Sequence, residues 1–195
     1  DVAGMSAASK AKRDDPDLDV VVFEKGEWVS YAACGMPYYV KGDVETLDDL
    51  VTVTPEAFVE ERGIDLRTNH EVTAVDRADR TVTVAGPDGE FEQAYGELLI
   101  ATGAQAIVPP FDGIDLDGVF TLHNMNEAAE IRHYLGLDTP TATLPESGYG
   151  EAAAEYAAAE QPDAVAVIGG GYVGIEMAEA FADRKSTRLN SSHYR

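Results

Sequence analysis

The apolar and polar positions in the first third of the chain predict a helix, a strand and a second helix. Small residues run from Gly4 into a stretch of lysine and arginine, and this pattern predicts a helix that ends at an Asp-Asp-Pro sequence. The next run, DLDVVVFEKG, is rich in β-branched residues, as is typical of a buried strand in a parallel sheet. In TLDDLVTVTPEAFVEERGI a loop leads into a helix, with Pro55 at its first position.

Three strand-like runs follow, and a further helical pattern comes after them. The runs are DLRTNHEVTAVDR, RTVTVAG and EFEQAYGELLIATG, and the GPDGE sequence between the last two predicts a hairpin turn. Residues 126–135 return to a helical pattern. An acidic stretch rich in alanine, proline and glycine, near residues 139–162, then interrupts this pattern, and we interpret it as an exposed insertion or linker.

The strongest motif in the chain is VAVIGGGYVGIE, which predicts a strand, a glycine turn and a helix. Gly169, Gly171 and Gly174 match the G-x-G-x-x-G pattern of dinucleotide-binding sites. The first glycine permits the tight turn, the second lets the backbone approach a pyrophosphate, and the third lets the helix pack closely on the strand. The positive N-terminus of the helix then faces the phosphate charge. A tight turn with no ligand is the alternative interpretation.

The sequence near the N-terminus indicates a second nucleotide-binding start. Gly4 precedes the first helix, and Glu24 ends the VVVFE run twenty positions later, where an acid binds a ribose hydroxyl in such folds. The strand and glycines expected before Gly4 are missing because the sequence begins at Asp1, and Glu24 taken alone is also consistent with a solvated strand end. Together the two starts predict an α/β protein with two Rossmann-like, three-layer dinucleotide-binding units, both incomplete.

The charge of the chain argues against two classes of partner. Its 36 aspartates and glutamates outnumber its 14 lysines and arginines, which gives a net charge of −22. A surface this negative repels phosphate backbones and anionic lipids, so we expect no nucleic-acid partner and no membrane partner. We interpret the charge as a halophilic-type acidic surface, adapted to a high-salt cytoplasm. An acidic face that only maintains solubility is the alternative.

The sequence gives no sign of export or of a metal site. No apolar run approaches the length of about 18 residues that spans a membrane, and the N-terminus lacks the pattern of a secretory signal. The chain has one cysteine, which cannot form an internal disulfide, so a reducing, cytoplasmic location is expected. The four histidines have no ligand-like spacing, and no metal is expected.

The single cysteine, Cys34, lies in the sequence SYAACGMPYY, in a loop that leads towards a helix. A thiol at a helix N-terminus is stabilised as the thiolate by the helix dipole. Its small neighbours, Ala32, Ala33 and Gly35, would give a cofactor or a substrate close access. An inert, buried cysteine is the alternative, and composition alone does not decide between the two.

The segment SYAACGMPYYVKGDV resembles the active-site segment of the single-cysteine flavoprotein disulfide reductases, which include coenzyme A disulfide reductases and related NADH oxidases and peroxidases. Glu24-Lys25, the HEV sequence at 70–72, the ATG sequence at 101–103 and GGGYVGIEMAEAF occur in that family's order and approximate spacing. The resemblance covers residues 1–184 apart from the acidic insertion. One departure is Ala33, where the reductases often have asparagine.

The resemblance implies domains, cofactors and site residues. It implies an FAD-binding domain over residues 1–118 that lacks its first strand, and the start of an NAD(P)H-binding domain over residues 119–184. Cys34 then matches the redox nucleophile beside the flavin, and Ser30 lies at the substrate pocket. Arg13 and Arg62 fall near basic positions that contact coenzyme A phosphates, with solvated surface charges as the alternative. The implied FAD contacts are Gly4, Glu24, Lys25, Val72, Ala101, Thr102 and Gly103, and the implied NAD(P)H contacts are Gly169, Gly171, Gly174 and Glu176.

The resemblance also implies an activity. Electrons would pass from NAD(P)H through FAD to Cys34, which would reduce a small-molecule disulfide, most like coenzyme A disulfide. Because the chain has no second thiol, the other sulfur would come from the substrate. An NADH oxidase or peroxidase that uses a cysteine sulfenic acid is one alternative, and a non-catalytic, nucleotide-binding redox sensor is another.

The resemblance and the composition set expectations for the chain's ends and assembly. The full-length protein is expected to be a homodimer. The last eleven residues, KSTRLNSSHYR, contain no acid, and we interpret residues 185–195 as a non-native tail. We expect the 195-residue chain by itself to hold FAD weakly and to be inactive.

Overall fold

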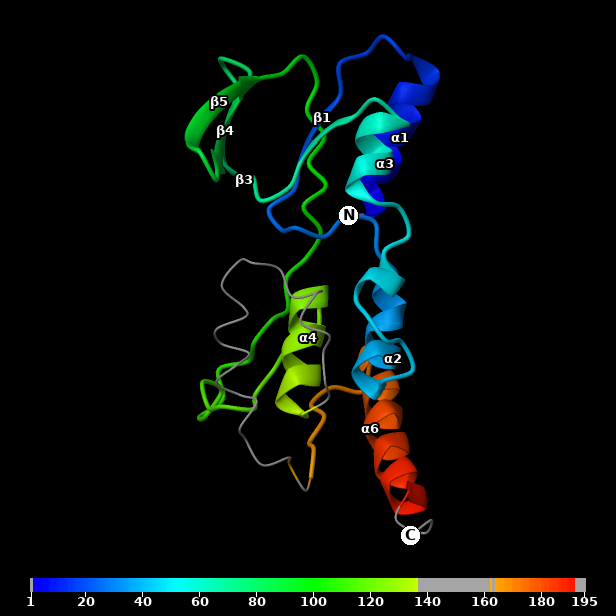
Figure 1. The fold of residues 1–195 in the computed structure, drawn as a ribbon. Coiled ribbons are helices and arrows are strands. Elements are labelled where there is room, and N and C mark those ends of the chain that lie inside the picture. The colour runs from blue at the N-terminus through cyan, green and yellow to red at the C-terminus, as the bar shows by residue number, and fades with distance from the viewer. Residues whose placement is uncertain (1, 137–161, 163, 192–195) are drawn as a thin grey trace. The chain divides into compact units, whose positions relative to one another are not determined.

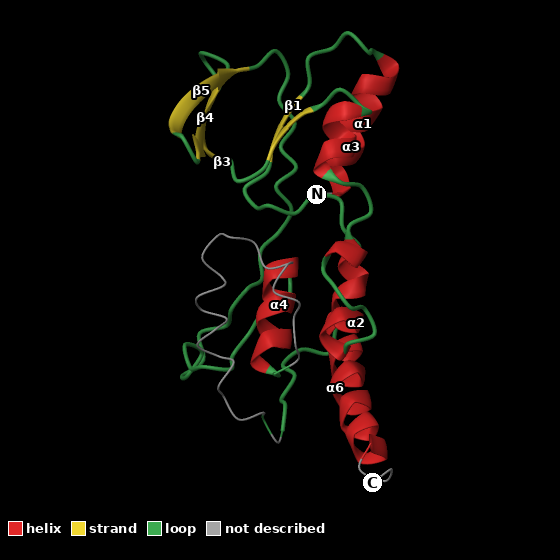
Figure 2. Ribbon diagram, in the orientation of Figure 1, coloured by secondary structure: helices red, strands yellow, loops and turns green. Residues whose placement is uncertain are grey.

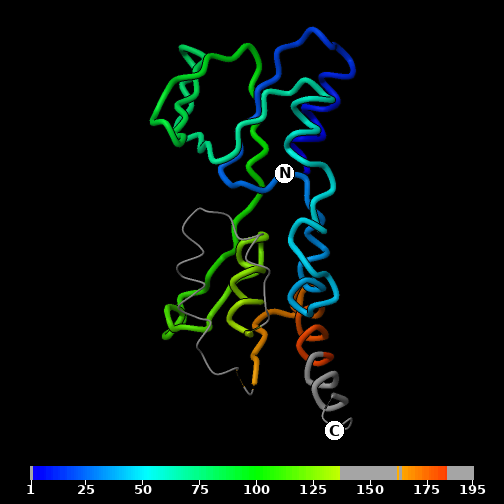
Figure 3. Tube along the Cα trace, viewed as in Figure 1, coloured from blue at the N-terminus to red at the C-terminus, as the bar shows by residue number. Residues whose placement is uncertain are grey.

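Figure 1 shows the computed structural model of the chain, which describes residues 2–136, 162 and 164–191, with the backbone alone for residues 184–191. The chain forms two compact units, and each is built from two segments. The first unit contains Asp1–Tyr31 and Val51–Ala104, and the second contains Ala32–Leu50 and Gln105–Arg195. The tube in Figure 3 follows the chain through these segments in colour order.

The first unit contains a parallel pair of strands with two helices beside it. Strand β1 (Val21–Phe23) pairs in parallel with β2 (Asp65–Arg67). Helix α1 (Val2–Asp14) contacts β1 and helix α3 (Pro55–Glu60) contacts β2, as Figure 2 shows. Burying one large apolar side chain contributes about 1.5–3 kcal/mol, so the shared core holds the two helices in place. The buried core residues are Met5, Ala8, Val29, Phe58 and Ile64.

A three-stranded antiparallel sheet completes the first unit. It consists of β3 (Glu71–Asp76), β4 (Thr81–Gly86) and β5 (Gly89–Ala94), in that order. Gly86 pairs with Gly89 across a two-residue turn, and Gly89 has φ of +116°, which glycine adopts without strain. Along β4 the side chains alternate between buried and half-buried positions, whereas those of β3 are exposed.

The regular elements in the described part of the second unit are helices. The 3₁₀ turn η1 (Ala33–Gly35) continues directly into helix α2 (Met36–Lys41), and a second 3₁₀ turn, η2 (Asp48–Leu50), follows. Helix α2 packs against α4 (Met125–Tyr134) and against α6 (Tyr172–Ser191). The segment that begins with the cysteine turn is therefore part of a helical cluster.

Two cations attach α2 to its neighbours. The buried Arg132 of α4 donates from Nη1 to the carbonyl oxygens of Tyr39, at 3.0 Å, and Val44, at 2.7 Å. Its guanidinium carbon also lies 4.3 Å from the centroid of the Tyr39 ring. Lys41 forms ion pairs with Asp43, at 2.8 Å, and with Asp183 of α6, at 3.0 Å. Charge-assisted contacts thus connect α2 to α4 and to α6.

The helices and the hairpin that the sequence predicts are confirmed. Helix α3 begins with Pro55 after the N-cap Thr54, whose Oγ1 accepts a hydrogen bond from the Ala57 amide at 3.2 Å. Helix α4 begins after Asn124, whose Oδ1 accepts from the Glu127 amide at 3.0 Å. The GPDGE turn lies between β4 and β5 as expected.

Two of the expected strands are wrong. Neither the second half of EFEQAYGELLIATG nor the VAVIG run before the glycine turn belongs to a sheet in the described residues. Their apolar side chains are exposed, Ile100 by 69% and Ile168 by 78%. A strand needs a neighbour that shares its backbone hydrogen bonds, and the described part of the chain places none beside these runs. Strand β1 is parallel as predicted but only half-buried, since the described residues give its sheet two strands.

Parts of the sequence-based predictions fall on residues that the structure does not describe. The acidic insertion expected near residues 139–162 lies outside the described residues except for Pro162. The expected boundary at residues 118 and 119 stays a prediction. The backbone of α6 extends to Ser191, within the expected tail, and residues 192–195 are not described. Among the described residues, no helix has both the length and the apolar character to cross a bilayer.

Candidate functional site

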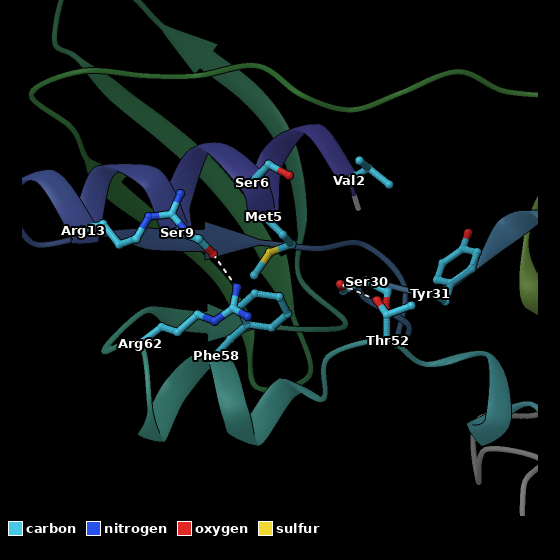
Figure 4. Close-up of a pocket in the computed structure, with 10 residues that line it drawn as sticks. All are labelled: Val2, Met5, Ser6, Ser9, Arg13, Ser30, Tyr31, Thr52, Phe58 and Arg62. Atoms are coloured by element: carbon cyan, nitrogen blue, oxygen red, sulfur yellow. Dashed lines mark hydrogen bonds between the residues drawn. The ribbon is translucent and has the colours of Figure 1, made fainter.

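A cavity of about 380 Å³ lies in the first unit, between α1, α3 and the segments around Ser30 and Thr52 (Figure 4). Two of its lining residues are arginines and none is a carboxylate, although the chain as a whole has 36 acids. In Figure 4 the two arginines lie towards one end of the cavity, and Ser30 and Thr52 lie towards the other. The lining residues are Val2, Met5, Ser6, Ser9, Arg13, Ser30, Tyr31, Thr52, Phe58 and Arg62.

The guanidinium of Arg62 is fixed on two sides. Its Nη1 donates a hydrogen bond of 2.8 Å to the Oγ of Ser9. Its central carbon lies 4.7 Å from the centroid of the Phe58 ring, which is a cation–π geometry. Ser9 is 5% exposed and Phe58 is 1% exposed, so both partners belong to the buried part of the unit. Arg62 therefore presents its charge to the cavity from a defined position.

Ser30 is held in an unusual backbone conformation at the other end of the cavity. Its φ of +52° lies in the left-handed region, which non-glycine residues seldom adopt. Its carbonyl oxygen accepts from the Thr52 amide at 2.8 Å and also from the Thr52 hydroxyl. The two side-chain oxygens lie 3.0 Å apart, within hydrogen-bond distance. Thr52 thus supports a conformation of the kind that clusters at functional sites.

Cys34 is a free, exposed thiol in the turn η1. The alternative of a buried cysteine therefore does not hold, and the reactivity of the thiol stays a prediction. The amide of Gly35 donates to the carbonyl of Ala32, and a Cβ at position 35 would lie 2.3 Å from a methyl of the buried Leu50. Glycine at this position lets Leu50 pack beneath the turn that carries the thiol. Cys34 belongs to the second unit, and it follows Ser30 by four residues in the chain.

The glycine turn before α6 has the geometry that its sequence predicts. Gly169 has φ of +123°, a conformation open to glycine. A Cβ at Gly174 would lie 2.1 Å from the Gly169 carbonyl oxygen, which no real side chain could tolerate. Among the described residues, no atom beyond the adjoining ones lies within 4 Å of a Cβ placed at Gly169 or Gly171, so this part of the turn leaves its backbone open to a ligand. These features fit a bound pyrophosphate at the N-terminus of a 20-residue helix, and Glu176 is exposed in its first turns.

The predicted flavin contacts in the first unit are partly brought together. A Cβ at Gly4 would lie 3.5 Å from the Cβ of Ala101, so the ATG sequence runs beside the first turn of α1. Thr102 is exposed, and Gly103 has φ of +68° with open space around it. The open backbone beside α1 fits the close approach of a nucleotide.

The other predicted flavin contacts lie around the end of β1. The carboxylate of Glu24 accepts a hydrogen bond of 2.8 Å from the Gly26 amide, so one of its oxygens is directed into its own loop. Lys25 forms an ion pair of 2.9 Å with Glu71, and this hydrogen bond raises the pKa of Lys25. Val72 lies in β3 and is 40% exposed. The assignment of these three residues to the flavin stays a prediction.

Sequence reasoning missed Ser9, Thr52 and Phe58. A signal for two of them was present, because cavity-lining residues of α1 recur at helical spacing from Val2 to Arg13 and so share one face. Phe58 and Arg62 are likewise four residues apart. The contact of Thr52 with Ser30 joins residues 22 positions apart, and no local pattern in the sequence indicates it.

The comparison with known families decides the class of protein. The family model described as pyridine nucleotide-disulphide oxidoreductase matches residues 1–189. The chain belongs to this family. Membership confirms the resemblance and the predicted enzyme class, because the family consists of oxidoreductases that use a pyridine nucleotide.

Known relatives of this oxidoreductase extend the comparison. It is 43% identical, over 180 residues, to the NAD(P)H coenzyme A polysulfide/persulfide reductase of Pyrococcus horikoshii. The aligned region covers 92% of this chain and 35% of the relative. It is 31% identical to the coenzyme A disulfide reductase of Staphylococcus haemolyticus, over 90% of this chain and 35% of the relative. The chain therefore spans about a third of the length of these relatives.

A solved structure supports the same assignment. The NAD-dependent persulfide reductase from A. fulgidus matches with a TM-score of 0.74 and 34% identity, over 93% of this chain and 30% of the solved chain. This likeness confirms the predicted fold class, α/β with Rossmann-type dinucleotide-binding units.

Proposed function

We propose that this oxidoreductase chain carries the redox cysteine and the substrate pocket of an NAD(P)H-dependent flavoprotein that reduces a disulfide or persulfide of coenzyme A. One observation carries the proposal. Arg13, Arg62 and Ser30, which the resemblance alone linked to the substrate, line the same cavity. Arg13 and Arg62 come from segments 49 positions apart, and the fact that both line one cavity supports a shared anionic ligand.

The charge of the cavity supports a phosphorylated substrate. A chain with a net charge of −22 repels an anion at long range, so an anionic substrate needs a local site that is positive. The two arginines provide such a site, since the planar guanidinium binds phosphate oxygens with paired hydrogen bonds. The names of the Pyrococcus horikoshii and Staphylococcus haemolyticus relatives both include coenzyme A, a phosphorylated thiol.

The elongated arrangement of the cavity supports a defined orientation of this substrate. With phosphates at the arginine end, the sulfur arm would extend towards Ser30. Cys34 follows Ser30 by four positions, so chain geometry alone keeps their Cα atoms within about 14 Å. The thiol therefore stays within reach of a long substrate arm that enters at Ser30.

Two dinucleotides fit the chain's nucleotide-binding residues. NAD(P)H would be held at the turn of Gly169, Gly171 and Gly174, and FAD beside Gly4 and the sequence from Ala101 to Gly103. When bound, these cofactors would supply the two electrons that the reduction needs, which NAD(P)H carries as a hydride. The position of Glu24 at the end of the VVVFE run supports a ribose contact.

The chemistry assigned to Cys34 is thiol–disulfide exchange. The Cys34 thiolate attacks one sulfur of the substrate disulfide, so a Cys34–substrate disulfide forms and one thiolate leaves and takes up a proton. Two electrons and a proton then cleave that mixed disulfide, which releases the second thiol and restores the Cys34 thiolate. With a persulfide, the same attack on the outer sulfur would release the thiolate of coenzyme A and leave a persulfide on Cys34. Two electrons would then cleave that S–S bond to hydrosulfide and the Cys34 thiolate.

Mass spectrometry of the full-length enzyme as isolated tests this proposal. We expect a coenzyme A adduct on Cys34, and we expect Cys34→Ser to lose NAD(P)H-dependent reduction of coenzyme A disulfide. Ser30→Ala is the comparison, since it removes a hydroxyl from the cavity and leaves the thiol in place. A sulfenic acid on Cys34, with no adduct after incubation with coenzyme A disulfide, would instead support an NADH oxidase or peroxidase. Full disulfide reductase activity in Cys34→Ser would refute the proposal.

A further inference from the structure

We propose that Ser9 is a positioning residue that holds the guanidinium of Arg62 ready for a phosphate group of the substrate. This inference rests on the proposed function, because it concerns the same cavity. It goes beyond that function by assigning a role to a buried serine of α1. The role is to fix the arginine before the substrate arrives.

The first step of the argument is the burial of Ser9. Its side chain is 5% exposed, and a buried hydroxyl needs a hydrogen-bond partner. The Nη1 of Arg62 supplies that partner at 2.8 Å, from a residue 53 positions away. Because α1 and α3 share one buried core, Ser9 cannot follow a movement of the arginine. The hydroxyl is therefore a fixed anchor for a long side chain.

The second step is the direction that the anchor imposes. The central carbon of the guanidinium lies 4.7 Å from the centroid of the Phe58 ring, and one edge of the guanidinium donates a hydrogen bond to Ser9 (Figure 4). A planar group held on one face and at one edge has a single orientation. A guanidinium carries five N–H donors, so donation of one to Ser9 leaves donors for a ligand. Arg13 follows Ser9 by four residues in α1 and lines the same end of the cavity.

The third step is the effect on binding. Ordering a flexible arginine side chain on binding costs free energy, and a side chain that is already ordered avoids this cost. Loss of the Ser9 hydroxyl should therefore weaken the binding of phosphorylated substrates, while substrates that lack phosphate should not be affected. This makes Ser9 a residue that determines specificity through Arg62.

The test measures KM and kcat of the full-length enzyme for coenzyme A disulfide and for the disulfide of pantetheine, which has the same thiol arm without the phosphates. For Ser9→Ala we expect KM for coenzyme A disulfide to rise about tenfold, with kcat retained, and KM for pantetheine disulfide to stay constant. Ser6→Ala makes the same chemical change in the same helix and cavity, at an exposed hydroxyl outside this hydrogen bond. It should change the ratio of the two KM values clearly less than Ser9→Ala.

Two further variants keep the test independent of folding defects at Ser9. Arg62→Lys keeps the charge on an exposed residue and removes the planar fork, so it should reproduce the loss of selectivity seen in Ser9→Ala. In an Arg62→Ala background, Ser9→Ala should add no further change, because the two residues act as a pair. Wild-type selectivity in Arg62→Lys, or equal effects of Ser9→Ala with and without Arg62, would overturn the inference.

Failure of the proposed function would look different. If the wild-type enzyme handled both disulfides equally well, the cavity would have no preference for phosphate, and both the proposed function and the role of Ser9 would be refuted. If wild type preferred coenzyme A disulfide and lost this preference in Arg62→Ala but not in Ser9→Ala, the inference about Ser9 alone would be wrong.

Discussion

Replacement of Arg132 by methionine should loosen α2, the helix that follows Cys34. The side chain is 7% exposed and donates to two carbonyl oxygens at the end of α2, at 3.0 Å and 2.7 Å. Hydrogen bonds from a charged group contribute about 1.5–3 kcal/mol each. The contact with the Tyr39 ring, at 4.3 Å, contributes about 0.5–2 kcal/mol more.

Two effects reduce the total free energy that these Arg132 contacts contribute to the stability of α2. The Nε of Arg132 is buried without a hydrogen-bond partner among the described residues, and its removal recovers about 1–3 kcal/mol. Methionine also fills part of the space with apolar atoms and retains some contact with Tyr39. Because such contributions are not additive, we expect a net loss of about 3 kcal/mol in the local stability of α2.

Amide hydrogen exchange in the full-length enzyme measures this loss. The amides of Gly42, Asp43 and Val44, which donate to the Tyr38 carbonyl, report the end of α2. A loss of about 3 kcal/mol lowers their protection about a hundredfold, since 1.4 kcal/mol corresponds to a factor of ten. Arg77→Met is the matched control, because Arg77 is exposed in the first unit and should leave these amides unchanged. A decrease of less than threefold in Arg132→Met would refute the assigned role.

Three further predictions follow from the structure. Gly174→Ala places a Cβ 2.1 Å from the Gly169 carbonyl oxygen, so KM for NAD(P)H should rise at least about tenfold. Gly170→Ala is the control, because a Cβ there meets no described atom within 4 Å, and it should raise KM clearly less. Equal KM values in the two variants would contradict this prediction. The hydrogen bond from Arg67 lowers the pKa of Asp65. The pair therefore stabilises the fold at pH values above the usual pKa of an aspartate, and this stabilisation is lost as the pH falls through the lowered pKa. Asp65→Asn should therefore flatten the acid side of the stability–pH curve, and an unchanged acid side would exclude the pair as its cause. If the net charge of −22 is an adaptation to salt, the melting temperature should rise with added KCl, and a constant value would exclude this interpretation.

Elements that depend on local sequence were predictable. Thr54 and Pro55 encode the start of α3 within one turn, and the two-residue turn before Gly89 encodes the β4–β5 hairpin. Runs such as residues 98–103 are apolar enough for a central strand, but a strand also needs a neighbour, and the pattern of a single run does not specify one. Local signals therefore predict helices and turns better than sheet partners.

The same distinction applies to the site. The glycine motif and Cys34 could be found because their chemistry is visible in a few adjacent residues. The hydrogen bond between Ser9 and Arg62 joins residues 53 positions apart, and the hydrogen bond between Arg132 and Tyr39 joins residues 93 positions apart. A serine in a helix and an arginine in another are ordinary residues until the fold brings them together, so only the structure reveals these pairs.

The placement of two guanidinium groups in a strongly acidic chain has a kinetic consequence. A negative body slows the diffusional encounter with an anionic ligand over distances of many ångströms, whereas the cavity attracts that ligand only at contact. The screening length falls from about 8 Å at physiological ionic strength to about 3 Å at 1 M salt. Added salt therefore weakens the long-range repulsion between the chain and the ligand more than the attraction at contact with the arginines. The association rate of a phosphorylated ligand should therefore increase with ionic strength, the reverse of the behaviour of sites that attract their ligands from afar.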